Sequence, residues 1–135
     1  MTEPEWVLRE TVLGLHEQSL HQHGGCAGIR DEGLLGSALG RPLNLFAYGE
    51  PSLHELAVSY VHELVENYAF IDGNKRTGFV VAVLMLELNG YHFHAQEADA
   101  ALRTLALAAG EMTESAYAAW LEQNCDPPAA TDVSG

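Results

Sequence analysis

Five consecutive residues near the middle of the chain carry the groups that a phosphate site requires. They are Asp72, Gly73, Asn74, Lys75 and Arg76. Lys75 and Arg76 supply positive charge, and Gly73 lets the backbone turn tightly and approach a ligand closely. The Asp72 carboxylate would repel a bare phosphate, but it can hold a divalent cation that bridges to phosphate oxygens. This composition predicts a site for a phosphate-containing anion and a metal ion.

The same residues are expected to lie at the start of a buried helix. Residues 79–88 are almost all apolar but too few to span a bilayer, so a helix that begins near Asn74 should lie in the core. The backbone N–H groups of its first turn would favour an anion, and Thr77 can add a hydroxyl. Phe70 and Ile71 are expected to anchor the preceding loop in the core. An ordinary helix start with two solvated cations has the same residue types, and neither a Walker A sequence nor G-x-G-x-x-G is present.

The charge balance limits the partners that the chain can have. The 135 residues include 6 Lys and Arg against 19 Asp and Glu, which gives a net charge of −13. We expect no direct binding to nucleic acid or to anionic membranes, because no general basic surface is available. Two of the six cations are the adjacent Lys75 and Arg76, so their position is informative. The N-terminus is polar and acidic and lacks a secretory signal, which favours a cytoplasmic protein.

The length and the hydrophobic periodicity predict a single mainly α-helical domain over residues 1–124 with about six or seven helices. Residues 125–135 lack apolar periodicity and are expected to form a disordered tail. The clearest helix starts at a capping box formed by Ser52 and Glu55 and should end near Asn67.

The remaining segments are predicted from their stop and cap residues. A first helix should end at Gly24, and a short helix capped by Asp31 should stop before Pro42. Residues 41–51 contain Pro, Asn and Gly with scattered aromatics, which favours an extended segment or hairpin. A last helix should begin near Thr113.

The stretch NYAFIDGNKRTG, residues 67–78, resembles the signature of the Fic/Doc family, written H-x-F-x-[DE]-[GA]-N-[KR]-R. Phe70 and the run from Asp72 to Arg76 match this signature. Lys75 followed by Arg and Thr is similar to the death-on-curing (Doc) branch, because the adenylyl-transferring Fic branch has Gly at that position. Residues 15–42 and 84–95 are similar to segments on either side of the motif in Doc toxins, so the resemblance covers nearly the whole chain.

The resemblance implies a Fic fold, a compact helical bundle with a short β-hairpin flap, for which residues 41–51 are the candidate. It implies transfer of a phosphate-containing group from ATP to a hydroxyl of a protein. In the Doc branch this would be phosphorylation of a translation factor, elongation factor Tu, which blocks growth; in Fic proteins it is AMP transfer by an adenylyltransferase. Asp72 would bind Mg²⁺, and the residues from Gly73 to Thr77 would hold the nucleotide phosphates, with Asp72, Lys75 and Arg76 acting in catalysis.

The resemblance also implies a partner. Doc toxins pair with a small antitoxin, Phd or a similar protein, whose C-terminal segment covers the toxin. This sequence contains no [ST]-x-x-x-E-[GN] segment of the kind that inhibits other family members from within the chain. Inhibition by a separate antitoxin is therefore expected.

The chain departs from the family signature at its first position, where Tyr68 replaces the His that acts as general base. An imidazole accepts a proton near pH 7, whereas a phenol with the ordinary pKa of about 10 is protonated. Loss of a positioned base typically costs about 10²- to 10⁴-fold in rate. The chain is therefore expected to be inactive or strongly impaired, through an introduced inactivating substitution or through natural divergence. A third interpretation is that Tyr68 itself acts, as a phenolate or as a modified residue.

The sequence offers other histidines as candidates for a substitute base. His62 is expected on an exposed face of its helix, and His16 lies in a stretch that could face the site. Two hypotheses remain: an impaired Doc-like transferase, and a catalytically dead binding module that occupies an antitoxin, a nucleotide or a target protein.

Overall fold

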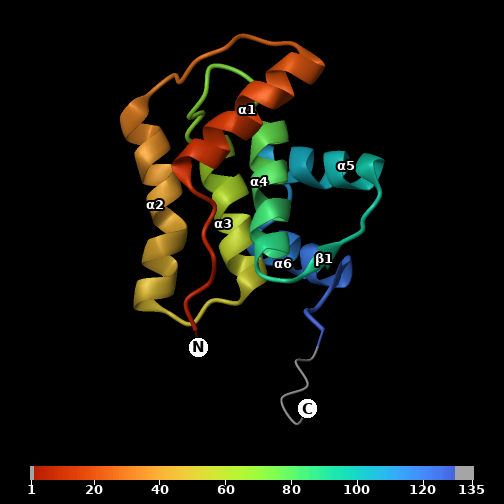
Figure 1. Cartoon of the computed structure of the whole chain (residues 1–135). Coiled ribbons are helices and arrows are strands. Elements are labelled where there is room, and N and C mark those ends of the chain that lie inside the picture. Colours follow the sequence, from red (N-terminus) through yellow and green to blue (C-terminus); the bar gives the residue numbers. More distant parts are fainter. Residues whose placement is uncertain (1, 130–135) are drawn as a thin grey trace.

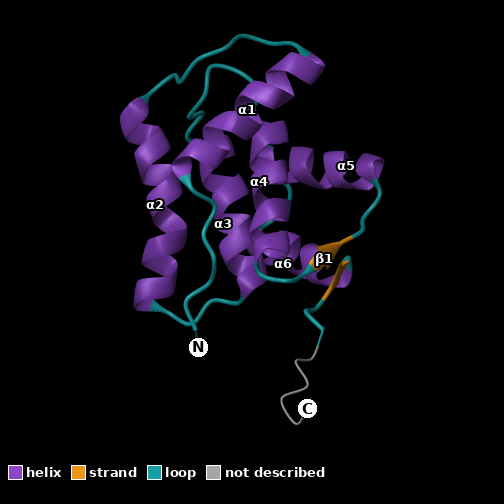
Figure 2. Ribbon diagram, viewed as in Figure 1, coloured by secondary structure: helices purple, strands orange, loops and turns teal. Residues whose placement is uncertain are grey.

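The computed structural model describes residues 2–129, which form six helices and one two-stranded antiparallel sheet (Figures 1 and 2). The helices are α1 (Arg9–His23), α2 (Glu32–Tyr48), α3 (Leu53–Glu66), α4 (Asn74–Leu88), α5 (Glu97–Ala108) and α6 (Glu114–Gln123), and the strands are β1 (His92–Phe93) and β2 (Cys125–Asp126). The predicted mainly α-helical fold with a short β element is confirmed. None of the described helices is long and apolar enough to cross a membrane.

Helix α3 lies at the centre of the fold and fixes one side of the site. Nine of its 14 residues are buried, and it packs against α2, α4 and α6. The predicted capping box is confirmed, because the Ser52 hydroxyl accepts from the Glu55 N–H while the Glu55 carboxylate accepts from the Ser52 N–H. Helix α4 runs back along α3 (Figure 1). A Cβ at Gly78 would lie 3.0 Å from Val61 Cγ2, so glycine allows the two helices to pack closely.

Helix α4 starts at Asn74 as predicted, but only one of its faces is buried. Its core face consists of Val81, Ala82, Met85 and Leu86, whereas Val80 is 39% exposed. The apolar run therefore supplies both a core face and part of the protein surface. That surface faces a groove, described below.

The prediction for residues 41–51 is wrong. Helix α2 continues through Pro42 to Tyr48 instead of stopping before the proline, although its cap at Asp31 is as predicted. Pro42 is buried on the same face as Leu35 and Ala38, so packing against α3 compensates for the backbone hydrogen bond that proline cannot make. Residues 41–51 also lie toward the end of the bundle away from the 67–73 loop (Figure 1). They cannot form a flap over the candidate site in this arrangement.

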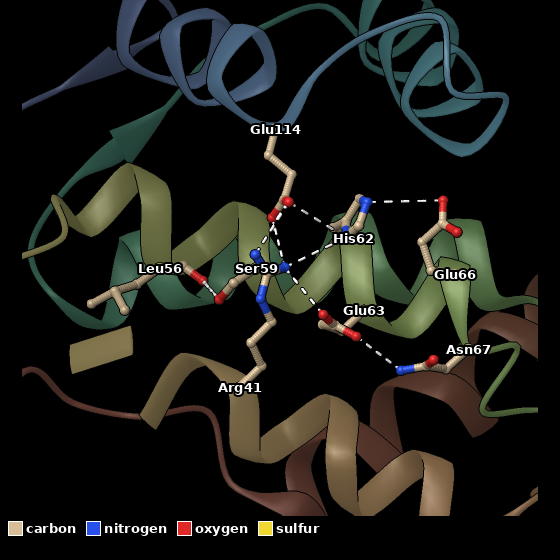
Figure 3. Close-up of polar contacts among 8 residues, drawn as sticks. All are labelled: Arg41, Leu56, Ser59, His62, Glu63, Glu66, Asn67 and Glu114. Carbon is tan, nitrogen blue, oxygen red and sulfur yellow. Dashed lines mark hydrogen bonds and ion pairs between the residues drawn. The ribbon is translucent and has the colours of Figure 1, made fainter. Parts of the chain in front are cut away.

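An ion cluster gives a second reason for the long α2 helix (Figure 3). Arg41 is half-buried and pairs with Glu114 of α6 at 2.7 Å and with Glu63 of α3 at 3.2 Å. The hydrogen bond to Glu114 raises the pKa of the Arg41 guanidinium above its ordinary value. One guanidinium therefore connects α2, α3 and α6. The packing of these three helices stabilises the continuation of α2 as far as Arg41.

The C-terminal segment differs in part from the expected tail. Phe93 pairs with Cys125 and His92 with Asp126, so Cys125–Asp126 is a strand and not part of a disordered tail. The rest of the predicted tail falls mostly in residues 130–135, which lie outside the described residues. Trp120 is buried, and its indole N–H donates to Asp99 at 2.9 Å, in keeping with a packing role.

Candidate active site

The loop between α3 and α4 is shaped by one side chain, Asn74. The Phe70 N–H donates to Asn74 Oδ1 and Asn74 Nδ2 donates to the Phe70 carbonyl, both at 2.9 Å. Phe70 is buried as predicted, but Ile71 is 53% exposed, so the expectation that it anchors the loop is wrong. Gly73 then adopts the left-handed conformation, with φ of 79°, directly before α4. The sequence therefore folds this loop locally around Phe70, Gly73 and Asn74.

A hollow of about 180 Å³ opens at this loop. Its lining contains all but one of the predicted site residues: Tyr68, Asp72, Gly73, Asn74, Lys75 and Arg76, together with Val65 and Ile71. Thr77 does not line it. Thr77 is fully buried and its hydroxyl has no hydrogen-bond partner among the described residues, so the prediction that it offers a hydroxyl to the ligand finds no support in this geometry.

The start of α4 is suited to an anion. Among the described residues no side chain caps this helix. The backbone N–H groups of its first turn therefore have no side-chain acceptor and can donate to an anion in the hollow. Lys75 and Arg76 are both exposed at its rim. Arg76 is partly fixed, because its guanidinium lies 3.3 Å from the Ser19 hydroxyl and 3.3 Å from the Gly24 carbonyl.

The Asp72 carboxylate is held by two backbone amides. Oδ1 accepts from the Gly73 N–H at 2.8 Å, and Oδ2 accepts from the Cys26 N–H at 3.3 Å. The approach of the 25–26 turn is close, since a Cβ at Gly25 would lie 2.7 Å from Asp72 Oδ2. These contacts orient the carboxylate but leave further lone pairs on both oxygens.

The described residues fit Mg²⁺ better than a metal that needs several protein ligands. They contain no group of three or more His, Cys, Asp or Glu side chains close enough to hold a metal ion. Mg²⁺ is commonly held by one or two carboxylates while phosphates and waters complete its shell. Asp72 is exposed at the hollow and can serve as that carboxylate.

Tyr68 stands at the edge of the hollow with an unusual backbone. Its φ is 47°, in the left-handed region that non-glycine residues rarely adopt, and it is 60% exposed. Arg30 supports this conformation, because its guanidinium donates at 2.7 Å to the carbonyls of both Tyr68 and Asn67. Backbone strain of this kind concentrates at functional sites.

Residues 24–31 pack against the motif loop and were not predicted from the sequence. The Ile71 N–H donates to the Gly28 carbonyl at 3.1 Å, and the Arg30 N–H donates to the Ala69 carbonyl at 2.9 Å. The sequence carries a signal in Gly24, Gly25 and Gly28, all of which have positive φ, but Gly24 alone predicts no more than a helix stop. The strap, as we call residues 24–31, replaces the expected flap as the segment next to the site.

Comparison with known proteins decides the family. The model of the Fic/DOC family matches residues 6–86, which include α1, the strap, the motif loop and all but the last two residues of α4. The chain belongs to the Fic/Doc family. It is 32% identical to a protein named protein kinase doc from Escherichia phage P1 over 110 residues, which are 81% of this chain and 86% of that protein. It is 39% identical to a protein named toxin Doc from Mycolicibacterium smegmatis (strain ATCC 700084 / mc(2)155) over 94 residues, which are 67% of this chain and 69% of that protein.

The names of both relatives agree with the Doc branch that Lys75 indicated. None of the described histidines lines the hollow beside Tyr68. His62 lies within 3.7 Å of Glu114 and 3.8 Å of Glu66 in the half-buried cluster of Figure 3, so the expectation of an exposed helix histidine is only partly met. His16 does reach the motif loop, but its Nε2 already contacts the Asp72 carbonyl at 2.7 Å.

Proposed function

We propose that this chain is a Doc-type toxin whose site holds Mg²⁺ and ATP, and that its family reaction transfers a phosphate-containing group to a hydroxyl of a protein target. The observation that carries the proposal is the hollow at the start of α4, which gathers Tyr68, Asp72, Lys75 and Arg76. We further propose that Tyr68 leaves binding intact and impairs the transfer. The name of the phage P1 relative, a protein kinase, favours transfer of the γ-phosphate.

In this proposal each group has a separate task. The backbone N–H groups at the start of α4, with Lys75 and Arg76, bind and orient the nucleotide phosphates. The Asp72 carboxylate would hold Mg²⁺, which when bound would supply positive charge to neutralise the phosphates. Gly73 and the strap hold the Asp72 carboxylate in place. The Asn74 side chain acts indirectly, since it is engaged with Phe70.

The step that Tyr68 impairs is the removal of a proton. In γ-transfer the acceptor oxygen forms a bond to the γ-phosphorus, the bond to the β–γ bridging oxygen breaks, ADP leaves, and the hydroxyl proton passes to residue 68. In AMP transfer the bond forms at the α-phosphorus and pyrophosphate leaves. A neutral imidazole can accept that proton near pH 7, whereas a phenol is already protonated. The expected loss is about 10²- to 10⁴-fold in rate.

The test compares the chain as it stands with Tyr68→His and Tyr68→Phe, using a bacterial cell extract that contains elongation factor Tu and ATP labelled at the α- or γ-phosphate. Transfer of the γ label by the Tyr68→His protein supports a Doc-like kinase, and transfer of the α label supports an adenylyltransferase. Tyr68→Phe keeps the ring and removes the hydroxyl, so activity of the unmodified chain that disappears in this variant would assign the chemistry to Tyr68 itself. Labelling by no variant, with Mg-ATP still bound, would leave the binding module as the function and reject the transferase.

We also propose that the C-terminal segment of a Phd-like antitoxin binds a groove beside the site. The groove has a volume of about 510 Å³ and is lined by residues of α1, α4 and α5. Its exposed apolar side chains include Val80 and Leu105, and Lys75 and Arg76 line it as well as the hollow. An apolar segment with acidic residues would match both features and would cover the phosphate site through the two shared cations.

A further inference from the structure

His16 of α1 lies directly against the motif loop, although it is 56 residues away from Asp72 in the sequence. It is only 5% exposed. Its ring stacks on Phe70, with centroids 3.7 Å apart and an angle of 10° between the planes. A Cβ on Gly73 would lie 3.7 Å from His16 Nε2, so the ring packs immediately beside the turn that precedes α4.

The polar contact of His16 is directed at the backbone of Asp72. His16 Nε2 lies 2.7 Å from the Asp72 carbonyl oxygen. A carbonyl oxygen only accepts hydrogen bonds, so Nε2 carries the proton and donates. This nitrogen is therefore unavailable as a general base while the contact is kept. Its effect is to hold the peptide group of the residue that presents the carboxylate.

Asp72 is thus held from two sides. His16 fixes its carbonyl, and the N–H groups of Gly73 and Cys26 fix its two carboxylate oxygens. Ligands of a metal ion are commonly oriented by such surrounding hydrogen bonds, and loss of one typically weakens metal binding or activity by about 10- to 100-fold. Contacts of this kind matter most where one carboxylate faces a site, and Asp72 is the one acidic residue among the described residues that line the hollow.

We propose that His16 is a positioning residue for Asp72: its Nε2–H fixes the Asp72 peptide group so that the carboxylate points into the hollow toward a phosphate-bound divalent cation. The role of the cation rests on the proposed function, but the orientation of Asp72 does not. The stacking contact with Phe70 orients the His16 ring, and the Nε2–H group holds the Asp72 carbonyl.

Two substitutions separate the effect of the His16 Nε2–H donor from the effect of the ring stacking on Phe70. His16→Phe keeps an aromatic ring against Phe70 and removes the N–H. His16→Gln replaces the ring but can place an amide N–H near the position of Nε2. His16→Leu is a second donor-free variant in case the Phe protein does not fold, and urea unfolding establishes that each variant is folded before it is used.

Two measurements are made on each folded protein. Amide hydrogen exchange of Gly73 and Cys26, followed by NMR without ligand, reports the hydrogen bonds that hold the carboxylate. Calorimetric titration measures the Kd of the site for Mg-ATP. In His16→Phe or His16→Leu we expect exchange at both amides to rise by about tenfold or more and the Kd for Mg-ATP to rise by about tenfold. In His16→Gln both should stay within about threefold of the unmodified chain.

The outcomes distinguish this inference from the proposed function. Unchanged exchange at Gly73 and Cys26 in the donor-free variants would overturn the positioning role, whether or not the affinity for Mg-ATP changes. Equal loss of protection in His16→Gln and His16→Phe would show that the ring stack, and not the N–H, holds the loop, and would also overturn it. Faster exchange only in the donor-free variants, in a chain that does not bind Mg-ATP at all, would support the positioning of Asp72 and reject the proposed function instead.

Discussion

Asn74 closes the motif loop onto Phe70 through two hydrogen bonds of 2.9 Å, one accepted from the Phe70 N–H and one donated to the Phe70 carbonyl. Both residues are buried, so the Phe70 N–H and carbonyl lose their protein partner when the side chain is removed. Asn74→Ala should lower the free energy of unfolding by about 2 kcal/mol or more, because buried backbone groups lose their partner. Urea unfolding measures this change.

Asn67→Ala is the matched control for that substitution. Asn67 is only partly buried and its amide contacts Glu63 on the same helix at 2.9 Å. Its loss should cost less than about 1 kcal/mol. Equal destabilisation by the two substitutions would contradict a special role of Asn74 in shaping the loop.

Asp72→Ala tests the metal site in the chain that carries Tyr68. We expect the affinity for ATP in the presence of Mg²⁺ to fall by about tenfold or more, equivalent to about 1.4 kcal/mol, and the difference between titrations with Mg²⁺ and with EDTA to disappear. Calorimetry measures both. Glu17→Ala removes an exposed carboxylate that lines neither the hollow nor the groove, and it should leave the affinity for Mg-ATP unchanged. Unchanged binding by the Asp72 variant would count against the metal role.

Gly25→Ala tests the strap. The new Cβ would lie 2.7 Å from Asp72 Oδ2, so the carboxylate or the strap must move. We expect Mg-ATP binding to weaken by about tenfold. Gly24→Ala is a close control, because Gly24 also has a positive φ but nothing lies within 4 Å of its Cβ position. Both variants should lose some stability through backbone strain. A loss of affinity that is the same in the two variants would mean that strain, and not contact with Asp72, is responsible.

His54 predicts how stability changes with pH. Burial lowers the pKa of the His54 imidazole below its usual value of 6.5, against the opposing effect of the Glu122 carboxylate. The unfolded state then binds more protons than the folded state between about pH 6.5 and the lower pKa of the folded protein, so stability falls as the pH drops through this window, by at most about 1.4 kcal/mol per pH unit from this group.

The measurement for His54 is urea unfolding at pH 7, 6 and 5. His54→Phe keeps a ring in the edge contact with Tyr91 and removes the titrating group, so its stability should depend less on pH. His21→Gln changes an exposed histidine and should leave the profile unchanged. A profile of His54→Phe that parallels that of the unmodified chain would show that other groups cause the pH dependence.

Leu105 tests the groove as the antitoxin site. Leu105 and Leu102 are both exposed on α5, at 51% and 66%, but only Leu105 lines the groove. Leu105→Glu should weaken binding to a Phd-like antitoxin by about tenfold or more, since it places a charge in an apolar contact, whereas Leu102→Glu should have little effect. Titration of the purified chain with the antitoxin measures this. Equal effects of the two substitutions, or none, would place the antitoxin elsewhere.

Local sequence was sufficient for the elements that frame the site. The capping box at Ser52, the start of α4 at Asn74 and the cap at Asp31 are each set by side chains within a few residues, and each was predicted. The turn from Phe70 to Asn74 is also shaped locally, because the hydrogen bonds between Asn74 and Phe70 and between Asp72 and Gly73 span four residues or fewer. Such features are encoded by neighbouring residues and can be seen in the sequence.

Residues 41–51 show where local signals failed. Gly40 and Pro42 favour a helix end, but the structure continues α2 to Tyr48 because Pro42 is buried against the core and Arg41 connects three helices. The stabilisation comes from α3 and α6, which lie far away in the sequence. No pattern within the segment itself reports those contacts.

The sequence by itself determined that this chain is a mainly helical Fic/Doc protein with the family motif at the start of α4 and Tyr68 at the first position of that motif. Only the tertiary structure decided what surrounds the motif loop. His16 and Arg30 lie 56 and 38 residues from the loop atoms that they contact, and the Cys26 N–H lies 46 residues from the carboxylate that it holds. Contacts over such separations depend on how the helices pack, and packing is a property of the whole chain and not of any short stretch of it.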